Sequence, residues 1–154
     1  MRLCVILILL AILAAWSVFL PQTVYAAKPF HIGAEKCGRL CHKVEYGSWL
    51  ATKHAKAFEM LPAADRAKKE CVQCHITGGL QELPGVQCEA CHGPGSEYKS
   101  LSVMKSREKS IAAGLLLPTE KVCLGCHNSK SPHFKTFNFA EMVKKIHDHK
   151  PKSK

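Results

Sequence analysis

Eight cysteines form four close pairs, and a histidine follows the second cysteine of every pair. The motifs read C-G-R-L-C-H, C-V-Q-C-H, C-E-A-C-H and C-L-G-C-H, so three have two residues between the cysteines and the first has three. Two thiols on one turn of backbone can each form a thioether with a haem vinyl group, and the next histidine then lies beneath the ring and binds the iron. The spacing therefore predicts four covalently bound haem c groups. The predicted attachment residues are Cys37, Cys41, Cys71, Cys74, Cys88, Cys91, Cys123 and Cys126, and the predicted proximal iron ligands are His42, His75, His92 and His127.

Three other uses of these cysteines compete with haem attachment. Eight cysteines in an exported chain can form four disulfides. The second and third pairs also have the spacing of a zinc ribbon, C-x2-C-x13-C-x2-C, and a single C-x-x-C can act as a redox dithiol. None of these three uses explains why a histidine follows all four pairs.

The first residues have the pattern of a secretory signal peptide. Arg2 precedes an apolar run, Leu3–Leu20, and the small residues of Val24-Tyr25-Ala26 stand at the −3 and −1 positions of a cleavage site. We predict a signal peptide at 1–26, a tetrahaem cytochrome c domain at 27–154, and a periplasmic or extracellular location. The alternative is an uncleaved anchor, because 18 apolar residues are at the lower limit for crossing a bilayer. Membrane association is expected only in that case.

The chain is basic, with a formal net charge of +10. Such a charge is typical of proteins that bind nucleic acid or anionic lipid. Haem changes this interpretation, since each haem adds two propionates against one positive charge at ferric iron. Four haems would subtract about four charges when oxidised and about eight when reduced. We therefore expect no nucleic-acid partner.

The fold is predicted to be mainly α with long loops, a compact multihaem cytochrome c fold built around the four haems. A mature chain of about 128 residues buries only a moderate core of its own, and strand patterns are nearly absent from the sequence. Asn138 and Glu141 have the spacing of a capping box at the start of the last helix. Helices are predicted over residues 48–60, 64–74 and 100–114 and from Asn138 onward, with loops at 78–85 and 93–95.

Five histidines remain after the four proximal ones, which predicts a second histidine ligand on several irons. His54 lies in the middle of the apolar stripe of the helix predicted at 48–60, so it is expected to bind iron. One of His147 and His149 is expected to do so from the last helix, and His147 lies better on its apolar stripe. His133 lies in a loop, and the sequence favours neither iron ligation nor a surface position for it. His31 is expected at the surface.

The sequence resembles the cytochrome c-554 family of tetrahaem carriers, relatives of which accept electrons from hydroxylamine oxidoreductase. The resemblance covers nearly the whole mature chain. The most specific stretch is the run from Cys88 to Gly95. The other stretches that carry it are Ser48-Trp49, His54-Ala55-Lys56-Ala57, Phe139-Ala140-Glu141-Met142-Val143-Lys144 and His147-Asp148-His149.

The resemblance implies which residue, if any, lies on the far side of each iron. His54 would bind the third haem and His147 the fourth, while the second haem would be five-coordinate, with His75 as its single histidine. In the family, the first haem takes its second histidine from the loop after the Gly-Pro-Gly turn, and residues 96–117 of this chain contain none. The candidates for the second ligand of the first haem are Met104, His31, His133, His149 and a histidine of another subunit. We hypothesise that His31 or His133 binds this haem, within the chain or between chains.

Electron transfer between redox protein partners is the main functional hypothesis. The sequence offers no acid–base pair or nucleophile that calls for more than a carrier, so we favour a carrier over an enzyme. The first alternative is a reductase of a small molecule such as a nitrogen oxide, acting at an open haem. The second is a homo-oligomer or filament in which neighbouring chains share haem ligands.

Overall fold

The computed structural model describes residues 27–79 and 83–149, so the predicted signal peptide lies outside the described residues. Among these residues the longest helix has eight residues, and none of the described helices is long and apolar enough to cross a membrane. The predicted fold class, mainly α with long loops, is confirmed. The helices are α2 (Ala34–Gly38), α3 (Lys43–Leu50), α4 (Lys69–Val72), α5 (Cys88–His92), α6 (Leu101–Met104), α7 (Arg107–Ala112), α8 (Glu120–Cys123) and α9 (Phe139–Met142), with 3₁₀ turns η1 (Ala63–Asp65) and η3 (Val143–Lys145).

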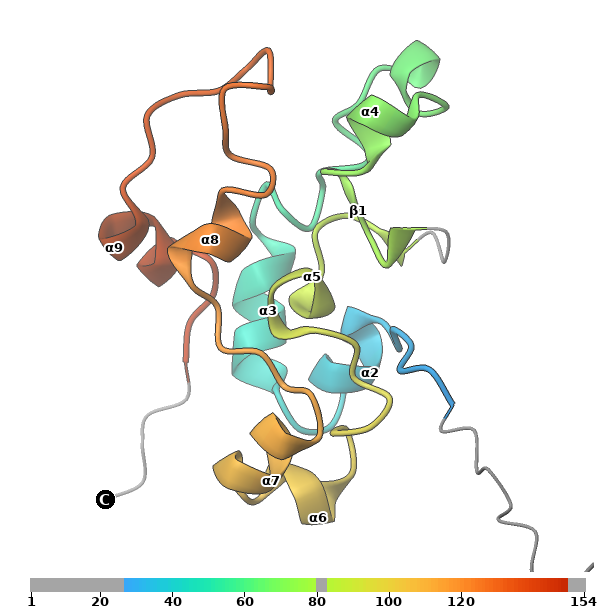
Figure 1. The fold of residues 1–154 in the computed structure, drawn as a ribbon, viewed down its shortest axis with the longest axis vertical. Helices are drawn as coiled ribbons and strands as arrows, with labels where there is room; N and C mark the ends of the chain where they lie inside the picture. The colour runs from blue at the N-terminus through green and yellow to red at the C-terminus, as the bar shows by residue number, and fades with distance from the viewer. Residues whose placement is uncertain (1–26, 80–82, 150–154) are drawn as a thin grey trace, which may run out of the picture.

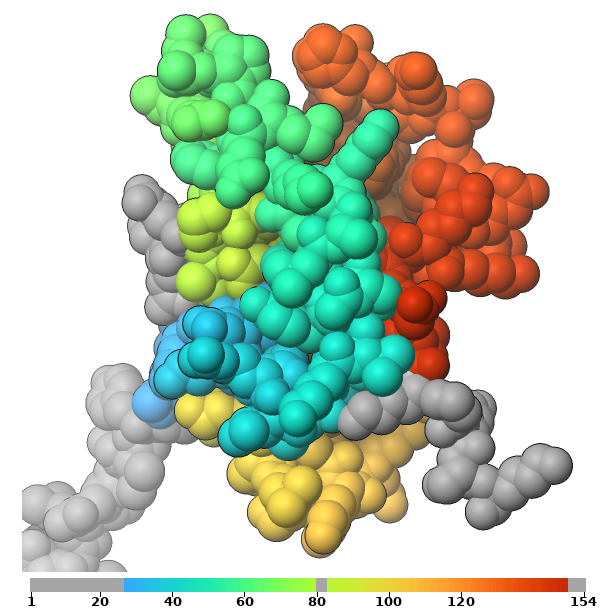
Figure 2. Space-filling view, turned by 180° about the vertical axis from the view of Figure 1, so that it is seen from behind, coloured from blue at the N-terminus to red at the C-terminus, as the bar shows by residue number. Residues whose placement is uncertain are grey.

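The helices surround a central group made by α2, α3 and α5 (Figure 1). The pair α6 and α7 closes one end of the molecule, α4 lies at the other end, and α8 and α9 lie along one side. Beside α4, strands β1 (Ile76–Thr77) and β2 (Leu83–Pro84) form a two-residue antiparallel pair. Viewed from behind, a notch separates the α4 region, in green, from the loop after α8, in orange (Figure 2). The four motifs are thus distributed around the molecule rather than along one helix.

A small core holds the central group together. Among the apolar residues, Trp49 is 7% exposed, and its indole N–H donates a hydrogen bond to the Val86 carbonyl at 3.0 Å. The ring of Trp49 stacks on Tyr46 with 5.8 Å between centroids. A Cβ atom on Gly38 would overlap the Tyr46 ring, so α2 can pack on α3 only because position 38 has no side chain. Every buried residue that the structure describes lies between Gly33 and Ser110.

The predicted helix over residues 48–60 is wrong. Helix α3 starts earlier and ends at Leu50, and consecutive turns follow it. The hydroxyl of Thr52 donates to the Trp49 carbonyl at 2.7 Å and accepts from the Ala55 N–H at 3.3 Å. A side chain that bonds to the nearby backbone in this way competes with the regular helical pattern.

Two carbonyls of this turn region are used by other parts of the chain. The His54 carbonyl accepts a hydrogen bond from the Val86 N–H at 2.9 Å. The Ala57 carbonyl lies 2.6 Å from Nδ1 of His75. The turns therefore expose carbonyls that a continued helix would have used internally, and His54 lies in a turn, not on a helical stripe.

The other predicted helices are shorter than expected. The stretch 64–74 contains only η1 and α4, and the basic stretch 100–114 contains α6 and α7, with Ser110 buried between their turns. The predicted helix start at Asn138 is confirmed, because its side chain accepts a hydrogen bond from the Glu141 N–H at 3.3 Å. Near the end of the described chain, the Asp148 N–H donates to the Ser48 hydroxyl at 2.7 Å, which ties this segment to α3.

Candidate haem-attachment sites

All four motifs begin on short helices, which place the two cysteines and the histidine on one turn. The first cysteines lie in α2, α4, α5 and α8. In the fourth motif the His127 N–H bonds to the Cys123 carbonyl at 2.9 Å, and in the first motif the His42 N–H bonds to the Cys37 carbonyl at 3.1 Å. In both motifs the histidine N–H therefore bonds to the carbonyl of the first cysteine, although the first motif has one residue more. A wider turn, closed by an i to i+5 bond, absorbs the extra residue.

The ring nitrogens of the proximal histidines are oriented by their surroundings. Nδ1 of His75 lies 2.6 Å from the Ala57 carbonyl, and Nδ1 of His92 lies 3.1 Å from the Leu116 carbonyl. A carbonyl only accepts hydrogen bonds, so Nδ1 carries the hydrogen in both rings. The lone pair is then on Nε2, which is the atom left to bind iron.

His42 of the first motif differs from these two histidines. Its Nδ1 lies 4.0 Å from Oε2 of Glu45, a carboxylate oxygen that is shielded from solvent. This distance is within ion-pair range but longer than a hydrogen bond. The first motif therefore differs from the second and third, because a carboxylate rather than a backbone carbonyl lies near Nδ1 of its proximal histidine.

Two of the spare histidines each stand opposite a proximal histidine. The ring of His54 lies 6.0 Å from the ring of His127, and the ring of His147 lies 6.4 Å from the ring of His92. Two imidazoles on one metal ion, each bonded at about 2 Å, have centroids about 6 Å apart. Nδ1 of His147 also lies 2.8 Å from the Asp148 carbonyl, which again leaves Nε2 for a metal. These residues fit iron ligation by two histidines.

This pairing is not the one that the family resemblance implies. His54 stands opposite the histidine of the fourth motif, and His147 stands opposite the histidine of the third motif. The resemblance implies His54 for the third haem and His147 for the fourth. Sequence spacing carries no signal for this difference, because His54 and His127 come together only through tertiary folding.

The rings in these pairs favour the neutral form that binds metals. Burial lowers the pKa of His54, and the neighbouring His127 lowers it further. Burial also lowers the pKa of His92, although its hydrogen bond to the Leu116 carbonyl acts in the opposite direction. Desolvation disfavours the charged imidazolium, so both rings carry a lone pair near neutral pH.

Cysteines of different motifs meet in two places. A hydrogen bond between the thiols of Cys37 and Cys88 raises the pKa of Cys37 and lowers that of Cys88. Burial and the neighbouring Cys74 raise the pKa of Cys126 to about 12. The first motif therefore lies beside the third, and the second beside the fourth.

The alternatives of disulfides and zinc gain no support from this geometry. None of the eight cysteines of the motifs is paired in a disulfide. In the described part of the chain, no three histidine, cysteine or acidic side chains converge so as to hold a metal ion by themselves. The second and third pairs therefore do not form the zinc-ribbon arrangement that their spacing allows.

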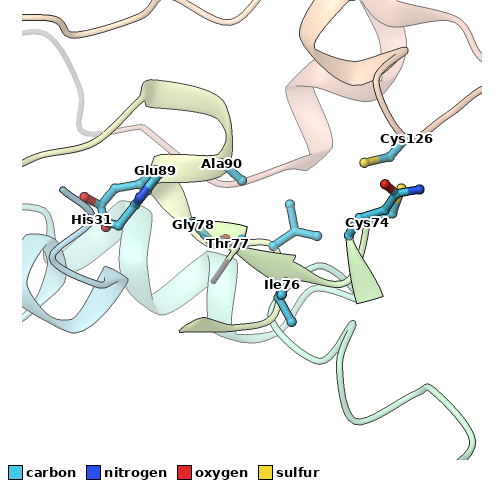
Figure 3. Close-up of a pocket in the computed structure, with 11 residues that line it drawn as sticks. His31, Cys74, Ile76, Thr77, Gly78, Glu89, Ala90 and Cys126 are labelled. Atoms are coloured by element: carbon cyan, nitrogen blue, oxygen red, sulfur yellow. The ribbon is translucent and has the colours of Figure 1, made fainter. Parts of the chain in front are cut away.

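A cavity of about 270 Å³ lies where three motifs meet (Figure 3). Cys74 and Cys126 line one part of it, and Glu89 and Ala90 of α5 line another. His31 also lines this cavity, with its ring against Gly78. The sequence predicted His31 at the surface, but the residue is half-buried.

The remaining candidate ligands have different surroundings. His133 is exposed and belongs to the loop between α8 and α9, which extends toward the end of the molecule that α4 occupies (Figure 1). This placement does not favour His133 as a ligand of the first haem in the same chain. His149 has its ring 4.5 Å from that of His147. The sulfur of Met104 lies 3.8 Å from the Ser110 hydroxyl.

Sequence reasoning did not identify the part played by Glu89, between the two cysteines of the third motif. Its side chain is 2% exposed, and its carboxylate accepts hydrogen bonds from the N–H groups of Ile32, Gly33 and Gly95. The only hint was its position in the run from Cys88 to Gly95. A glutamate in that position is by itself compatible with solvent exposure.

Three comparisons with known proteins point to one family. The family model described as cytochrome c554 and c-prime matches residues 36–93. Cytochrome c-554 of Nitrosomonas europaea is 32% identical over 187 aligned positions, which cover 83% of this chain and 79% of that protein. The solved structure of reduced cytochrome c554 from Nitrosomonas europaea has 30% identity and a TM-score of 0.63, and the match covers 80% of this chain and 87% of that one.

Proposed function

Because the chain belongs to the cytochrome c554 family of multihaem electron-transfer cytochromes, we propose that it carries electrons between two redox protein partners outside the cytoplasm. The protein holds four covalently bound haem c groups, as the proteins of this family do. Haem c iron takes up and releases one electron, and the protein sets its potential through axial ligands and their hydrogen bonds. A location outside the cytoplasm is supported by the signal-peptide pattern of residues 1–26.

We assign attachment to the eight cysteines of the four motifs and proximal ligation to His42, His75, His92 and His127. The observation that carries this assignment is the pair of ring separations at about the distance two histidines have on one metal ion. For the fourth haem we propose His127 and His54 as the two ligands, and for the third His92 and His147. The hydrogen bond from His42 to the Cys37 carbonyl supports attachment at the first motif despite its extra residue.

The contacts between cysteines support a relay of two haem pairs. Attachment at Cys37 and Cys88 would bring the first and third haems side by side, and attachment at Cys74 and Cys126 would do the same for the second and fourth. Electron exchange depends on such short separations. A carrier built in this way needs exposed haem edges but no catalytic base.

The assignment is tested by mass spectrometry and by the spin state of each haem. The secreted protein should start near Ala27 and carry four haem masses. His54→Ala and His147→Ala should each convert one low-spin haem to high spin while all four haems stay attached. Lys130→Ala, in an exposed loop, is the control and should leave the spectrum unchanged.

A double variant separates the proposed pairing from the exchanged one. With Cys123→Ala and Cys126→Ala the fourth haem is not attached, so adding His54→Ala should create no new high-spin haem. If a new high-spin haem does appear, His54 serves another iron and the pairing is wrong. Alkylatable Cys37 and Cys41 in the native protein would mean that the first motif holds no haem.

A further inference from the structure

Glu89 is a buried carboxylate at the junction of the first and third motifs. Oε1 accepts hydrogen bonds from the Ile32 N–H at 2.8 Å and the Gly95 N–H at 2.6 Å. Oε2 accepts from the Ile32 N–H at 3.0 Å and the Gly33 N–H at 2.7 Å. All these contacts come from N–H donors, which are the partners that carboxylate oxygens accept. We call Glu89 and these three N–H groups the Glu89 clamp.

The clamp joins segments that are far apart in the sequence. Residues 32–33 lead directly into α2, while Gly95 ends the Gly-Pro-Gly turn after α5. Gln87 adds a parallel contact, because its side-chain oxygen accepts from the Ala34 N–H at 2.7 Å. The side chains of Gln87 and Glu89, on either side of Cys88, therefore bind backbone N–H groups at the N-terminal end of α2.

Space around the clamp is limited. A Cβ atom on Gly95 would lie 3.0 Å from Oε1 of Glu89 and 3.1 Å from Cδ1 of Ile32. The Gly95 N–H can reach the carboxylate this closely because the residue has no side chain. Buried charge is costly unless hydrogen bonds compensate it, and bonds from N–H groups to a carboxylate are among the stronger ones.

The clamp sets the position of the first motif relative to the third. The Gly33 carbonyl accepts a weak hydrogen bond from the Cys37 thiol at 3.7 Å, and the same thiol meets that of Cys88. The clamped residues and both cysteines thus belong to one contact between α2 and α5.

We infer that Glu89 is a positioning residue that fixes the first and third haem-attachment sites side by side and places a negative charge next to both. This inference rests on the proposed attachment of haems at those two motifs. A fixed negative charge opposes the gain of an electron nearby, so Glu89 lowers the potentials of the haems beside it.

The test is Glu89→Gln, which keeps the shape but removes the charge and turns one acceptor into a donor. In spectroelectrochemical titration of the holoprotein, two of the four one-electron steps should move to higher potential. We expect the equilibrium constant of reduction to rise about tenfold for each, about 59 mV for one electron. The matched control is Glu97→Gln, which removes the same charge from an exposed position eight residues away.

A second variant separates position from charge. Glu89→Asp keeps the charge but withdraws the oxygens from the N–H groups, so it should leave the potentials near wild type and weaken the Soret circular-dichroism couplet between adjacent haems. A Gln variant that moves no more than the Glu97 control, or moves all four steps equally, would overturn the electrostatic part. An unchanged couplet in the Asp variant would overturn the positioning part. Mass spectrometry of the wild-type protein tests haem attachment separately. A missing haem at Cys37 and Cys41 would count against the proposed function.

Discussion

The stretch from Gly33 to Ser110 and the stretch from residue 118 to residue 149 are packed in different ways. The first contains all the buried residues that the structure describes, and its helices are joined by Trp49, Gly38 and Glu89. The second contains α8, α9 and η3 but no buried residue. One region is therefore held by long-range contacts between side chains and backbone, whereas the side-chain contacts described within the other join residues close in sequence.

The apolar residues of the second region show what is needed to stabilise it. Leu124, Phe134 and Met142 are each about two-fifths exposed, at 42%, 40% and 41%. The region also carries the fourth motif and His147. Covering apolar surface contributes about 25 cal/mol per Å², so we expect the attached macrocycles to supply the packing that the protein chain does not. In such a region the cofactor acts as part of the core.

The largest expected effect is the loss of order in the C-terminal region when the fourth haem cannot be attached. In the double variant Cys123→Ala, Cys126→Ala, amide hydrogen exchange at 118–149 should approach that of an unfolded chain, whereas residues 33–110 should keep their protection. Hydrogen exchange with mass spectrometry measures both regions in one sample. Lys130→Ala should change neither, and full protection of 118–149 in the double variant would contradict the comparison.

A smaller effect is expected where the protein packs by itself. Gly38→Ala places a methyl group against the Tyr46 ring, and overpacking of this kind typically costs about 1–3 kcal/mol. Gly47→Ala is the matched control, because Gly47 lies inside α3 with open space around it. Alanine there should raise the free energy of unfolding by about 0.5–1 kcal/mol.

Guanidinium denaturation of the holoprotein, followed by circular dichroism, gives the sign of both changes. The midpoint should fall for Gly38→Ala and rise for Gly47→Ala. Equal midpoints for the two variants would mean that the contact between α2 and α3 contributes little to stability.

The smallest effects come from the helix caps of the two regions. Ser106 caps α7 by accepting from the Lys109 N–H at 3.2 Å, and Asn138 caps α9 by accepting from the Glu141 N–H at 3.3 Å. Removing a cap costs about 1 kcal/mol. Ser106→Ala should lower global stability by about that amount, because α7 packs through the buried Ser110.

Asn138→Ala should lower global stability less and increase exchange only around α9, whose residues are not buried. Site-resolved hydrogen exchange distinguishes local fraying from a global change. A full loss of global stability from the Asn138 variant would show that α9 is part of the cooperative core.

Features set by short-range chemistry could be predicted from the sequence. The four motifs predicted covalent haem because their cysteines and histidine lie on one turn, and this cofactor prediction is confirmed. The cap at Asn138 depends on two residues three positions apart, and it too was correct. The helix over 48–60 was wrong because tertiary hydrogen bonds to Val86 and His75 occupy its carbonyls.

Features set by long-range contacts could not be predicted. His54 and His127 meet across 73 positions of sequence, and nothing local to either residue names its partner. The Glu89 clamp depends on N–H groups 56 and 57 positions away. Counting the histidines that do not follow a cysteine pair gave the set of spare ones, but the folded chain was needed to pair them with the motifs.

The hydrogen bond from Asp148 to Ser48 has a consequence for the way the protein matures. It closes a loop of 100 residues, and each doubling of loop length adds about 0.6 kcal/mol to the entropic cost of closure. The second, third and fourth motifs all lie inside this loop. We expect the loop to close last, after every enclosed motif has been loaded, and a stalled chain would keep an open end that proteases can attack.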